Sequence, residues 1–306
     1  MAAAAATAGA QIHSPVHLSF APRPPPIPTR PHASTMTVLP RLNLHAFNLQ
    51  RSLRRRFFSP VAAAVRQDTT VWSPAPLSLV EDAAESLFHI TVDLSDSPDV
   101  AESFTRPGQY LQLRVPDAPK PVFLAIASAP SPRAEMEFLV KSVPGTTSEA
   151  LCGLRKGEVV ELSMVMGKGY DIDQISPSEK FPTVLLFATG SGISPIRSLI
   201  EWGFGADKRS DVRLYYGAGN LERMAYQDKF KAWESSGIKI VPVLSKSDSK
   251  WSGERGYVQD AFTRNKRISA PKSTGAVLCG HQQMTEAVTS LLTSDGVSSD
   301  KILKNF

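Results

Sequence analysis

The segment that most constrains this chain runs from Phe187 to Ile196 and reads Phe-Ala-Thr-Gly-Ser-Gly-Ile-Ser-Pro-Ile. An apolar run of strand length leads into it, and Gly190 and Gly192 permit a tight turn. Ser194 is then a candidate helix cap, and Pro195 suits the first helical position. Such a helix start presents free backbone N–H groups and a positive dipole end, which favour a pyrophosphate. On spacing alone, a Gly-x-Gly turn predicts a structural turn as readily as a phosphate site.

After Pro182 the sequence alternates between apolar strands and helical segments. The predicted strands are Thr183–Thr189, Asp211–Gly217, Ile238–Leu244, Gly275–Gly280 and Lys301–Phe306. The predicted helices lie near Ser194–Trp202, Ala225–Ser235, Tyr257–Asn265 and Met284–Leu292. This alternation, with continuous apolar strands, indicates a parallel sheet covered on both faces. We therefore expect an α/β domain with a five-stranded parallel sheet over residues 181–306.

Before this region, short β-rich runs are separated by turn residues. The predicted strands are Thr70–Leu79, Leu87–Leu94, Gln109–Val115, Val122–Ala127, Glu135–Val143 and Val159–Val165, and the one predicted helix is Ser148–Leu154. Six strands with such connections indicate a small antiparallel barrel. We expect this six-stranded β-barrel over residues 68–175, followed by a polar linker, Asp171–Lys180.

The first 67 residues differ in composition from the rest. Eight of the 34 Lys and Arg residues lie there, all of them Arg, while none of the 29 Asp and Glu residues does. The remainder therefore carries 26 basic against 29 acidic side chains, so the net charge of +5 says nothing about nucleic acid binding. An acid-free leader rich in Arg, Ala, Ser and Thr is typical of an organelle transit peptide. The opening Met1-Ala2 favours the chloroplast, and Arg54-Arg55-Arg56-Phe57-Phe58-Ser59 keeps the mitochondrion as the alternative.

Composition also excludes several classes of protein. Cys152 and Cys279 are the two cysteines of the chain, and an iron–sulfur cluster needs about four cysteine ligands. No His, Cys and carboxylate cluster has metal-ligand spacing, and no apolar run is long enough to cross a membrane. Any redox chemistry must therefore use an organic cofactor.

Several motifs together resemble one family. The loop Thr189–Pro195 resembles the NAD(P) pyrophosphate loop of the ferredoxin–NADP reductase superfamily, and Cys279-Gly280-His281-Gln282-Gln283-Met284 is similar to its Cys-Gly-Pro-x-x-Met. The other matching segments are Arg106-Pro107-Gly108-Gln109-Tyr110, Tyr216-Gly217-Ala218 with Ala225-Tyr226, and Gly256-Tyr257-Val258-Gln259. These segments follow the family's order over residues 70–306. The resemblance implies a flavin barrel followed by an NAD(P) domain.

The flavin side departs from the family pattern. The family carries Arg-x-Tyr-Ser-x-x-Ser on a barrel strand, and here Val122, Leu124 and Ala125 replace its Arg, Tyr and first Ser. Loss of a phosphate partner and of a ring stack should weaken flavin binding by about 2–4 kcal/mol. Lys120 and Lys141 are the candidate replacement charges. The stretch from Lys141 to Ser148 resembles the family's Gly-x-x-Ser/Thr turn for flavin pyrophosphate, although Ser148 alone also reads as a helix cap.

The resemblance implies a set of site residues. Cofactor-binding roles fall on Gly108, Gln109, Tyr110, Ala125, Ile126, Ala127, Ser128, Lys141, Gly145, Thr147, Ser148, Gly167, Thr189, Gly190, Gly192, Ile193, Pro195, Ser245, Lys246, Arg255, Tyr257 and Gly280. Cys279 would lie beside the nicotinamide, and Phe306 would either stack on the flavin or pack in the core. Ser245, Lys246, Arg255 and Tyr257 resemble the positions that bind the 2′-phosphate of NADP, although NADH-dependent relatives carry similar segments.

These resemblances imply FAD and NADP, or NAD, as cofactors. The enzyme hypothesis is hydride transfer from NAD(P)H to flavin and electron transfer to a separate acceptor, with a ferredoxin-like protein as one candidate. The alternative is a weakly active or inactive nucleotide-binding protein on the reductase fold, because three flavin-contacting positions are replaced.

Overall fold

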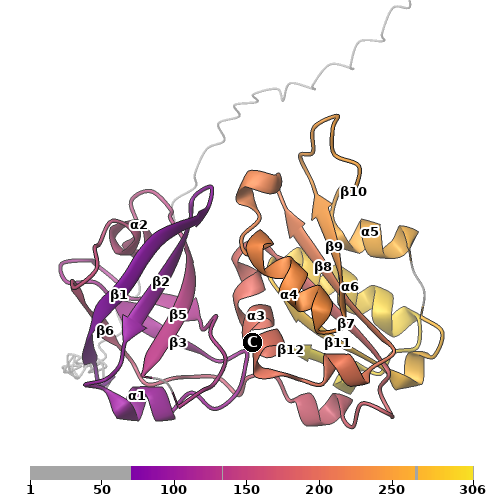
Figure 1. The fold of residues 1–306 in the computed structure, drawn as a ribbon, viewed down its shortest axis with the longest axis horizontal. Coiled ribbons are helices and arrows are strands. Elements are labelled where there is room, and N and C mark those ends of the chain that lie inside the picture. The colour runs from indigo at the N-terminus through magenta and orange to yellow at the C-terminus, as the bar shows by residue number, and fades with distance from the viewer. Residues whose placement is uncertain (1–69, 133, 266–267, 306) are drawn as a thin grey trace, which may run out of the picture. The chain divides into compact units, whose positions relative to one another are not determined.

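Six antiparallel strands form the first sheet, in the order β4-β3-β6-β1-β2-β5 (Figure 1). Their bounds are β1 Ser73–Ala84, β2 Leu87–Asp93, β3 Tyr110–Arg114, β4 Val122–Ala125, β5 Glu135–Lys141 and β6 Val159–Leu162. The antiparallel bridge between Ile126 and Phe138 joins the two edges of this sheet and closes it into a barrel. Apolar side chains at alternate positions, such as Leu111 and Leu113, fill the interior. The predicted barrel is confirmed.

This computed structural model describes residues 70–132, 134–265 and 268–305. The described residues fall within one compact unit of the chain. The predicted leader, residues 1–67, and Phe306 lie outside them. Two short helices accompany the barrel, α1 at Pro98–Glu102 and α2 at Thr147–Cys152. The sequence had predicted one helix, so α1 is an addition.

Six parallel strands form the second sheet, in the order β10-β9-β8-β7-β11-β12. Their bounds are β7 Thr183–Thr189, β8 Asp211–Ala218, β9 Ile238–Leu244, β10 Glu254–Arg255, β11 Thr274–Cys279 and β12 Ile302–Lys304. The five predicted strands are present, but the sheet has six strands, so the predicted number of strands was one too low. The missed strand, β10, has two charged residues and pairs in parallel with the end of β9.

Four helices cover this sheet: α3 Ile193–Trp202, α4 Phe230–Ser235, α5 Val258–Arg264 and α6 Gln282–Ser294. Val184 and Leu186 of β7 pack in one core with residues of α3 and α4. Leu185 and Phe187, which point to the opposite face, pack with residues of α5 and α6. Because both faces of β7 are buried, the strand reads as a continuous apolar run.

The barrel and the α/β lobe share a set of direct contacts, which we call the lobe junction. Leu87 and Leu139 of the barrel belong to the same buried cluster as Tyr226 of the α/β lobe. The Ser198 hydroxyl of α3 donates to the Ser128 carbonyl at 2.7 Å. Arg223 forms a bidentate ion pair with Glu85, with N···O distances of 2.6 and 3.0 Å. The junction therefore combines apolar packing with polar contacts.

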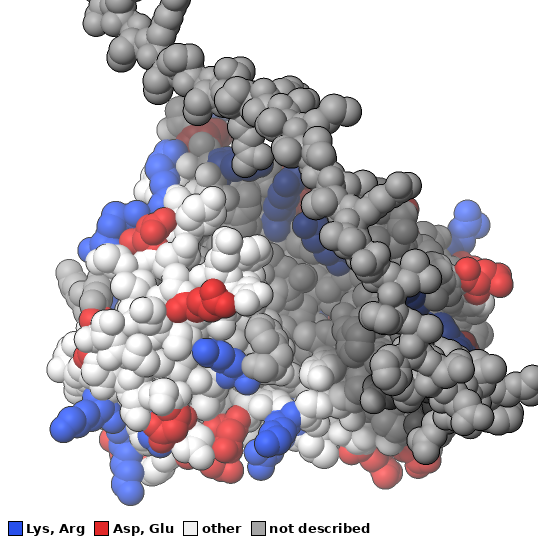
Figure 2. All heavy atoms as spheres, turned by 180° about the vertical axis from the view of Figure 1, so that it is seen from behind, with Lys and Arg blue, Asp and Glu red and all other residues white. Residues whose placement is uncertain are grey.

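The surface carries charges of both signs. On the side opposite to the view of Figure 1, Lys and Arg side chains lie interspersed with Asp and Glu over the described part of the surface (Figure 2). This mixture agrees with the near balance of basic and acidic residues after position 67. Among the described residues, no helix has the length and apolar character that crossing a membrane requires.

Candidate functional site

Two loops meet at the carboxyl edge of the parallel sheet, where the strand order reverses. β7 and β11 are neighbours, yet the chain continues from β7 to β8 on one side and from β11 to β12 on the other. Ala188 pairs with Cys279 at the ends of these strands. In open α/β sheets such a reversal point is where ligands bind. The loops that follow Thr189 and Cys279 therefore define the candidate site.

The first loop is a single 3₁₀ turn, Gly190–Gly192, between β7 and α3. Gly190 has φ +54°, and no atom lies within 4 Å of the position that a Cβ would occupy there. Gly192 is packed tightly instead, because its Cβ would lie 2.6 Å from the carbonyl oxygen of Cys279. The two glycines thus serve different purposes: Gly190 leaves the backbone open, and Gly192 lets the two loops touch.

The start of α3 differs from its prediction. The helix begins at Ile193 with Gly192 at the cap position and no side-chain cap, so Ser194 and Pro195 lie inside the first turn. The predicted cap at Ser194 and first position at Pro195 were wrong, because the 3₁₀ turn Gly190–Gly192 runs directly into the helix. The side chains of Ile193, Ser194 and Pro195 are buried. The Ile193 N–H is bonded to the carbonyls of Gly190 and Ser191, and Pro195 has no N–H, so the N–H groups left for a ligand are those of the turn Gly190–Gly192.

The second loop is locked onto the first. Gly280 has φ +142°, and a Cβ there would lie 2.1 Å from the Thr189 hydroxyl oxygen. That oxygen accepts a hydrogen bond from the His281 N–H at 2.9 Å. Thr189 and Gly280, both predicted to bind cofactor, therefore hold the two loops together.

Cys279 lies at the base of this junction and is 5% exposed. Burial raises the pKa of its thiol to about 12, although the Tyr170 hydroxyl, the Asn305 side chain and the Gly280 N–H act in the opposite direction. The thiol is therefore neutral near pH 7, and a neutral thiol is a poor nucleophile. Burial raises the pKa of Tyr170 well above its ordinary value, and the neighbouring Cys279 adds to the effect. The side chain of Tyr170 is itself buried.

Strand pairing decides which side chains of β4 face outward. Leu124 pairs with Leu111 and is buried in the barrel core, whereas Phe123 is 62% exposed. Tyr110 and Ala125 are paired on the same outer face as Phe123. The Tyr110 and Phe123 rings have centroids 6.2 Å apart. Leu124, which the resemblance places at the aromatic position of the family, therefore faces the barrel core, and Phe123 is the outward aromatic residue.

Three predicted cofactor-binding residues build the support of Tyr110. The Gln109 side-chain oxygen accepts from the N–H groups of Thr105 and Arg106, both at 2.9 Å, and its amide donates to the Gly167 carbonyl at 3.0 Å. A Cβ on Gly167 would lie 2.8 Å from the Tyr110 ring, and one on Gly108 would lie 2.9 Å from the Tyr170 ring. Gly108, Gln109 and Gly167 therefore interlock two loops and fix both tyrosines.

The residues that follow β4 belong to the lobe junction. Ile126 and Ala127 are fully buried. The Ser128 hydroxyl accepts from the Glu137 N–H at 3.1 Å, and the Ser128 carbonyl accepts from Ser198. In this structure the hydroxyl of Ser128 is used to hold β5.

The turn before α2 is closed by its own groups. The Gly145 N–H donates to the Glu149 carboxylate at 2.7 Å, and the Thr147 hydroxyl donates to the Lys120 carbonyl at 2.5 Å. The Ser148 hydroxyl forms a hydrogen bond with Thr146 at 2.7 Å. The helix starts at Thr147 after Thr146, so the predicted cap at Ser148 was wrong. Lys141 is exposed at the end of β5.

The residues predicted for the 2′-phosphate gather beyond β9 and β10. Ser245 and Lys246 are exposed, and the Lys246 N–H is bonded to the Gly219 carbonyl. Arg255 donates to the Ser247 hydroxyl at 2.7 Å and to the carbonyls of Asp248 and Trp251, so it braces its own loop. Tyr257 is exposed at the start of α5.

Sequence reasoning missed a buried charged cluster at the lobe junction. Arg197 of α3 lies between Glu137 of the barrel, at 2.6 Å, and Glu201 of its own helix, at 2.9 Å. Its guanidinium also lies 4.8 Å from the centre of the Tyr226 ring. His89 approaches the same Glu137 carboxylate at 2.8 Å. The available signal was one Arg within the apolar stretch Ile193–Ile200.

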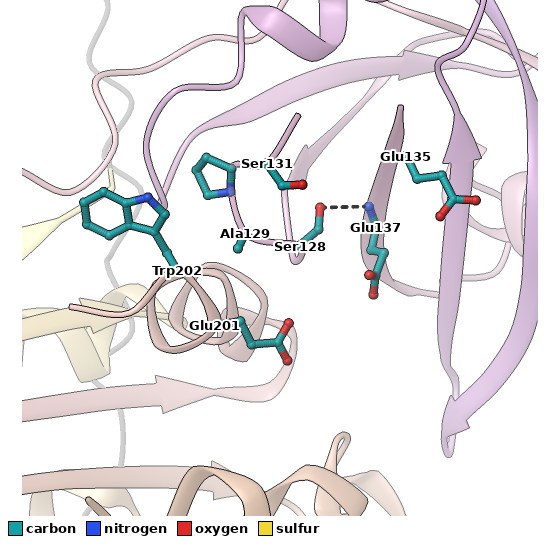
Figure 3. A pocket seen from close by; sticks show the side chains of 8 residues that line it. Ser128, Ala129, Ser131, Glu135, Glu137, Glu201 and Trp202 are labelled. Carbon is teal, nitrogen blue, oxygen red and sulfur yellow. Dashed lines mark hydrogen bonds between the residues drawn. The ribbon is translucent and has the colours of Figure 1, made fainter. Parts of the chain in front are cut away.

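This cluster borders a cavity of about 330 Å³. Figure 3 shows Glu137 on β5 and Glu201 near the end of α3 on its two sides, with the Ser128 hydroxyl bonded to the Glu137 N–H. The cavity lies at the carboxyl end of α3, whereas the glycine loop lies at its amino end. It is therefore separate from the candidate nucleotide site.

The comparisons with known proteins agree with this geometry. A family model described as an oxidoreductase NAD-binding domain matches residues 186–290. Fruit protein pKIWI502 of Actinidia deliciosa is 54% identical over 249 residues, which cover 78% of each chain. The xylene/toluene monooxygenase electron transfer component XylA of Pseudomonas putida is 26% identical over 236 residues, covering 75% of this chain and 65% of XylA, just under two thirds of its length.

Solved structures share the fold. The crystal structure of a ferredoxin NADP⁺ reductase from Neisseria gonorrhoeae with bound FAD and NADP superposes with a TM-score of 0.63 at 19% identity, covering 77% of this chain and 99% of that chain. The chain thus shares its two-lobe fold with that structure. The chain belongs to the ferredoxin–NADP reductase-like flavin oxidoreductases.

Proposed function

We propose that this protein is an NAD(P)H-dependent flavin oxidoreductase that passes electrons to a separate acceptor. The observation that carries the proposal is the open backbone at Gly190, next to the uncapped start of α3 and opposite the Cys279 loop. Free N–H groups and a positive helix end are the chemistry that a dinucleotide pyrophosphate requires. The family binds FAD and NAD(P).

The described residues fit the nucleotide. The N–H groups of the turn Gly190–Gly192, just ahead of α3, would hold the pyrophosphate, and the open space over Gly190 gives it room. Cys279 would pack beside the nicotinamide as a neutral, polarisable group, since burial keeps its thiol protonated. Lys246 would supply charge to a 2′-phosphate, so we propose NADPH ahead of NADH. Arg255 is the weaker candidate because it braces its own loop.

The described residues also fit a flavin ring. Tyr110 and Phe123 present two aromatic side chains on the outer face of the barrel, and such side chains stack on planar ring systems. A bound flavin supplies the chemistry of accepting a hydride and releasing electrons. The protein contributes position, because Gly108, Gln109 and Gly167 fix the tyrosine that supports the ring.

The test is a visible absorption spectrum of the protein with added FAD, before and after NADPH. We expect NADPH to bleach the flavin absorbance faster with protein than without it. Gly190→Ala places a methyl group in the open space and should raise the KM for NADPH about tenfold or more. Gly203→Ala is the matched control, because Gly203 also has positive φ and open space but lies at the far end of α3.

A second candidate function is nucleotide binding without turnover. The observation in its favour is the turn before α2, whose hydroxyls and Gly145 N–H are bonded within the chain. The same spectra separate the two: NADPH binding without acceleration of flavin reduction supports the second function and rejects the first.

We also propose that residues 1–67 direct import into the chloroplast, and that the electron acceptor is a soluble partner such as a ferredoxin-like protein. The support for import is the acid-free, Arg-rich composition of this segment. A fluorescent protein fused to residues 1–67 should enter chloroplasts, and accumulation in mitochondria would establish the alternative. Reduction of a ferredoxin by the protein and NADPH tests the partner.

A further inference from the structure

The two halves of the candidate flavin site differ in what they leave open. The ring half is exposed, with Phe123 and Tyr110 on the outer face of the barrel. The phosphate half, the turn Gly145–Ser148 before α2, has its three hydroxyls and the N–H groups of Gly145 and Thr146 in use. A ligand that binds both halves would leave the Phe123 and Tyr110 rings in place. It would have to break hydrogen bonds of the turn Gly145–Ser148.

The hydrogen bonds of this turn occupy its hydroxyl groups and the Gly145 N–H, which are among the groups that the family resemblance assigns to phosphate. Glu149 accepts from the Gly145 N–H at 2.7 Å. The Thr146 hydroxyl donates to the Val143 carbonyl at 2.7 Å and also pairs with Ser148. The Thr147 hydroxyl, which is buried, donates to the Lys120 carbonyl. A phosphate would have to displace these partners, and each displaced partner that stays buried loses a hydrogen bond.

The negative charge of Glu149 also opposes the binding of a phosphate at this turn. The Glu149 carboxylate accepts from the Gly145 N–H, within the turn where the resemblance places the flavin pyrophosphate. A phosphate group brings about one to two negative charges, and like charges at close range repel even near a surface. The outer face of β4 presents Phe123 and Ala125, so the candidate counter-charges Lys120 and Lys141 lie outside this strand. Val122 pairs with Leu113, whose side chain lies in the barrel core.

We propose that this barrel recognises flavins by their ring system alone, and that Glu149 acts as a selectivity residue against the phosphate. Riboflavin, FMN and FAD then bind with similar affinities and exchange freely. The inference rests on the proposed function, because the Tyr110 and Phe123 face must take the ring.

The experiment titrates the purified protein with riboflavin, FMN and FAD and follows the quenching of flavin fluorescence at low salt. We expect the three dissociation constants to agree within about threefold, since the shared ring supplies the contacts. In Glu149→Gln, which removes the charge and keeps an acceptor for Gly145, FMN and FAD should bind about five- to tenfold more tightly. Riboflavin should bind as before.

Glu158→Gln is the matched control. Glu158 accepts from the Arg155 N–H at 2.6 Å in another turn of the same barrel, so it repeats the local geometry away from the site. We expect this variant to leave all three affinities unchanged. Phe123→Ala should weaken binding of the three flavins by the same factor, because they share the ring.

The outcomes separate this inference from the proposed function. FAD that binds more than about tenfold more tightly than riboflavin overturns the inference and leaves the proposed function standing. Affinities that Glu149→Gln leaves unchanged also overturn it. Absence of binding by all three flavins overturns the inference and the flavin part of the proposed function together.

Discussion

Glu137 offers the most direct test of the lobe junction. Burial disfavours its ionised form, but the hydrogen bond with His89 and the charge of Arg197 outweigh burial and lower the pKa of Glu137 from 4.5 to about 2. A carboxyl group whose pKa falls on folding stabilises the folded state above its unfolded pKa. That contribution is lost as the pH falls through the folded pKa. The window here is therefore about pH 4.5 to about pH 2.

The size of the effect follows from the shift. Each pKa unit corresponds to about 1.4 kcal/mol, so the lowered pKa of Glu137 is equivalent to about 3 kcal/mol of folding free energy at pH 7. Its side chain is 27% exposed, which leaves solvent screening modest. Glu137→Gln, which resembles the protonated carboxyl, should therefore lose about 3 kcal/mol at pH 7 and about half of that at pH 3.

Urea unfolding of the original protein and of Glu137→Gln at pH 7, 5, 4 and 3 measures this difference. The gap in unfolding free energy should narrow as the pH falls. Glu135→Gln is the control, because Glu135 is an exposed residue of the same strand, two positions away. A gap that is as large at pH 3 as at pH 7 would refute the assignment of the effect to ionised Glu137.

Three further predictions concern the candidate site. Gly280→Ala should lower the unfolding free energy by about 2–4 kcal/mol, because Gly280 has φ +142° and a Cβ there would lie 2.1 Å from the Thr189 hydroxyl oxygen. An unchanged melting temperature would contradict this prediction. Burial raises the pKa of Cys279 to about 12 and that of Cys152 to about 11. Both thiols should therefore react with a disulfide reagent at pH 8 far more slowly than free cysteine. Rapid labelling of the folded protein would contradict this prediction. Phe123→Ala should weaken riboflavin binding by about five- to tenfold. Because this ring is largely exposed, the free energy of unfolding should change by no more than about 0.5 kcal/mol. Unaltered riboflavin binding would show that Phe123 is not part of the site.

The strands of the parallel sheet were the most predictable part of the fold. Thr183–Thr189 and Ile238–Leu244 have the bounds that the sequence predicts, because central parallel strands give uninterrupted β-rich runs. Glu254–Arg255 was missed because its two charged residues form an edge strand through pairing with β9 alone. Pro98–Glu102 was missed because five residues carry too little helical periodicity.

Side-chain roles were harder to predict than elements. The sequence motif places Gln109 and Ser128 at a flavin, yet their polar groups are bound to Gly167 and Glu137 in the structure. The pairing of β4 with β3 places Phe123, and not Leu124, on the outer face of the barrel. Neighbouring residues of a strand point to opposite faces, so a register shift of one residue changes which side chains face outward. Arg197 escaped notice because its two carboxylate partners lie 60 positions before it and one helical turn after it.

The contrast between the two halves of the site has one physical cause. The nucleotide half uses backbone groups, and glycines such as Gly190 and Gly192 determine where the backbone is open or closely packed. Glycine spacing is visible in a sequence, so this half could be predicted. The flavin half depends on side chains, whose hydrogen bonds can be redirected by one nearby carboxylate such as Glu149 without any change in the fold. On the role proposed for Glu149, a chain with this fold keeps its nucleotide loop unaltered while its selectivity among flavins changes through single substitutions in the turn before α2.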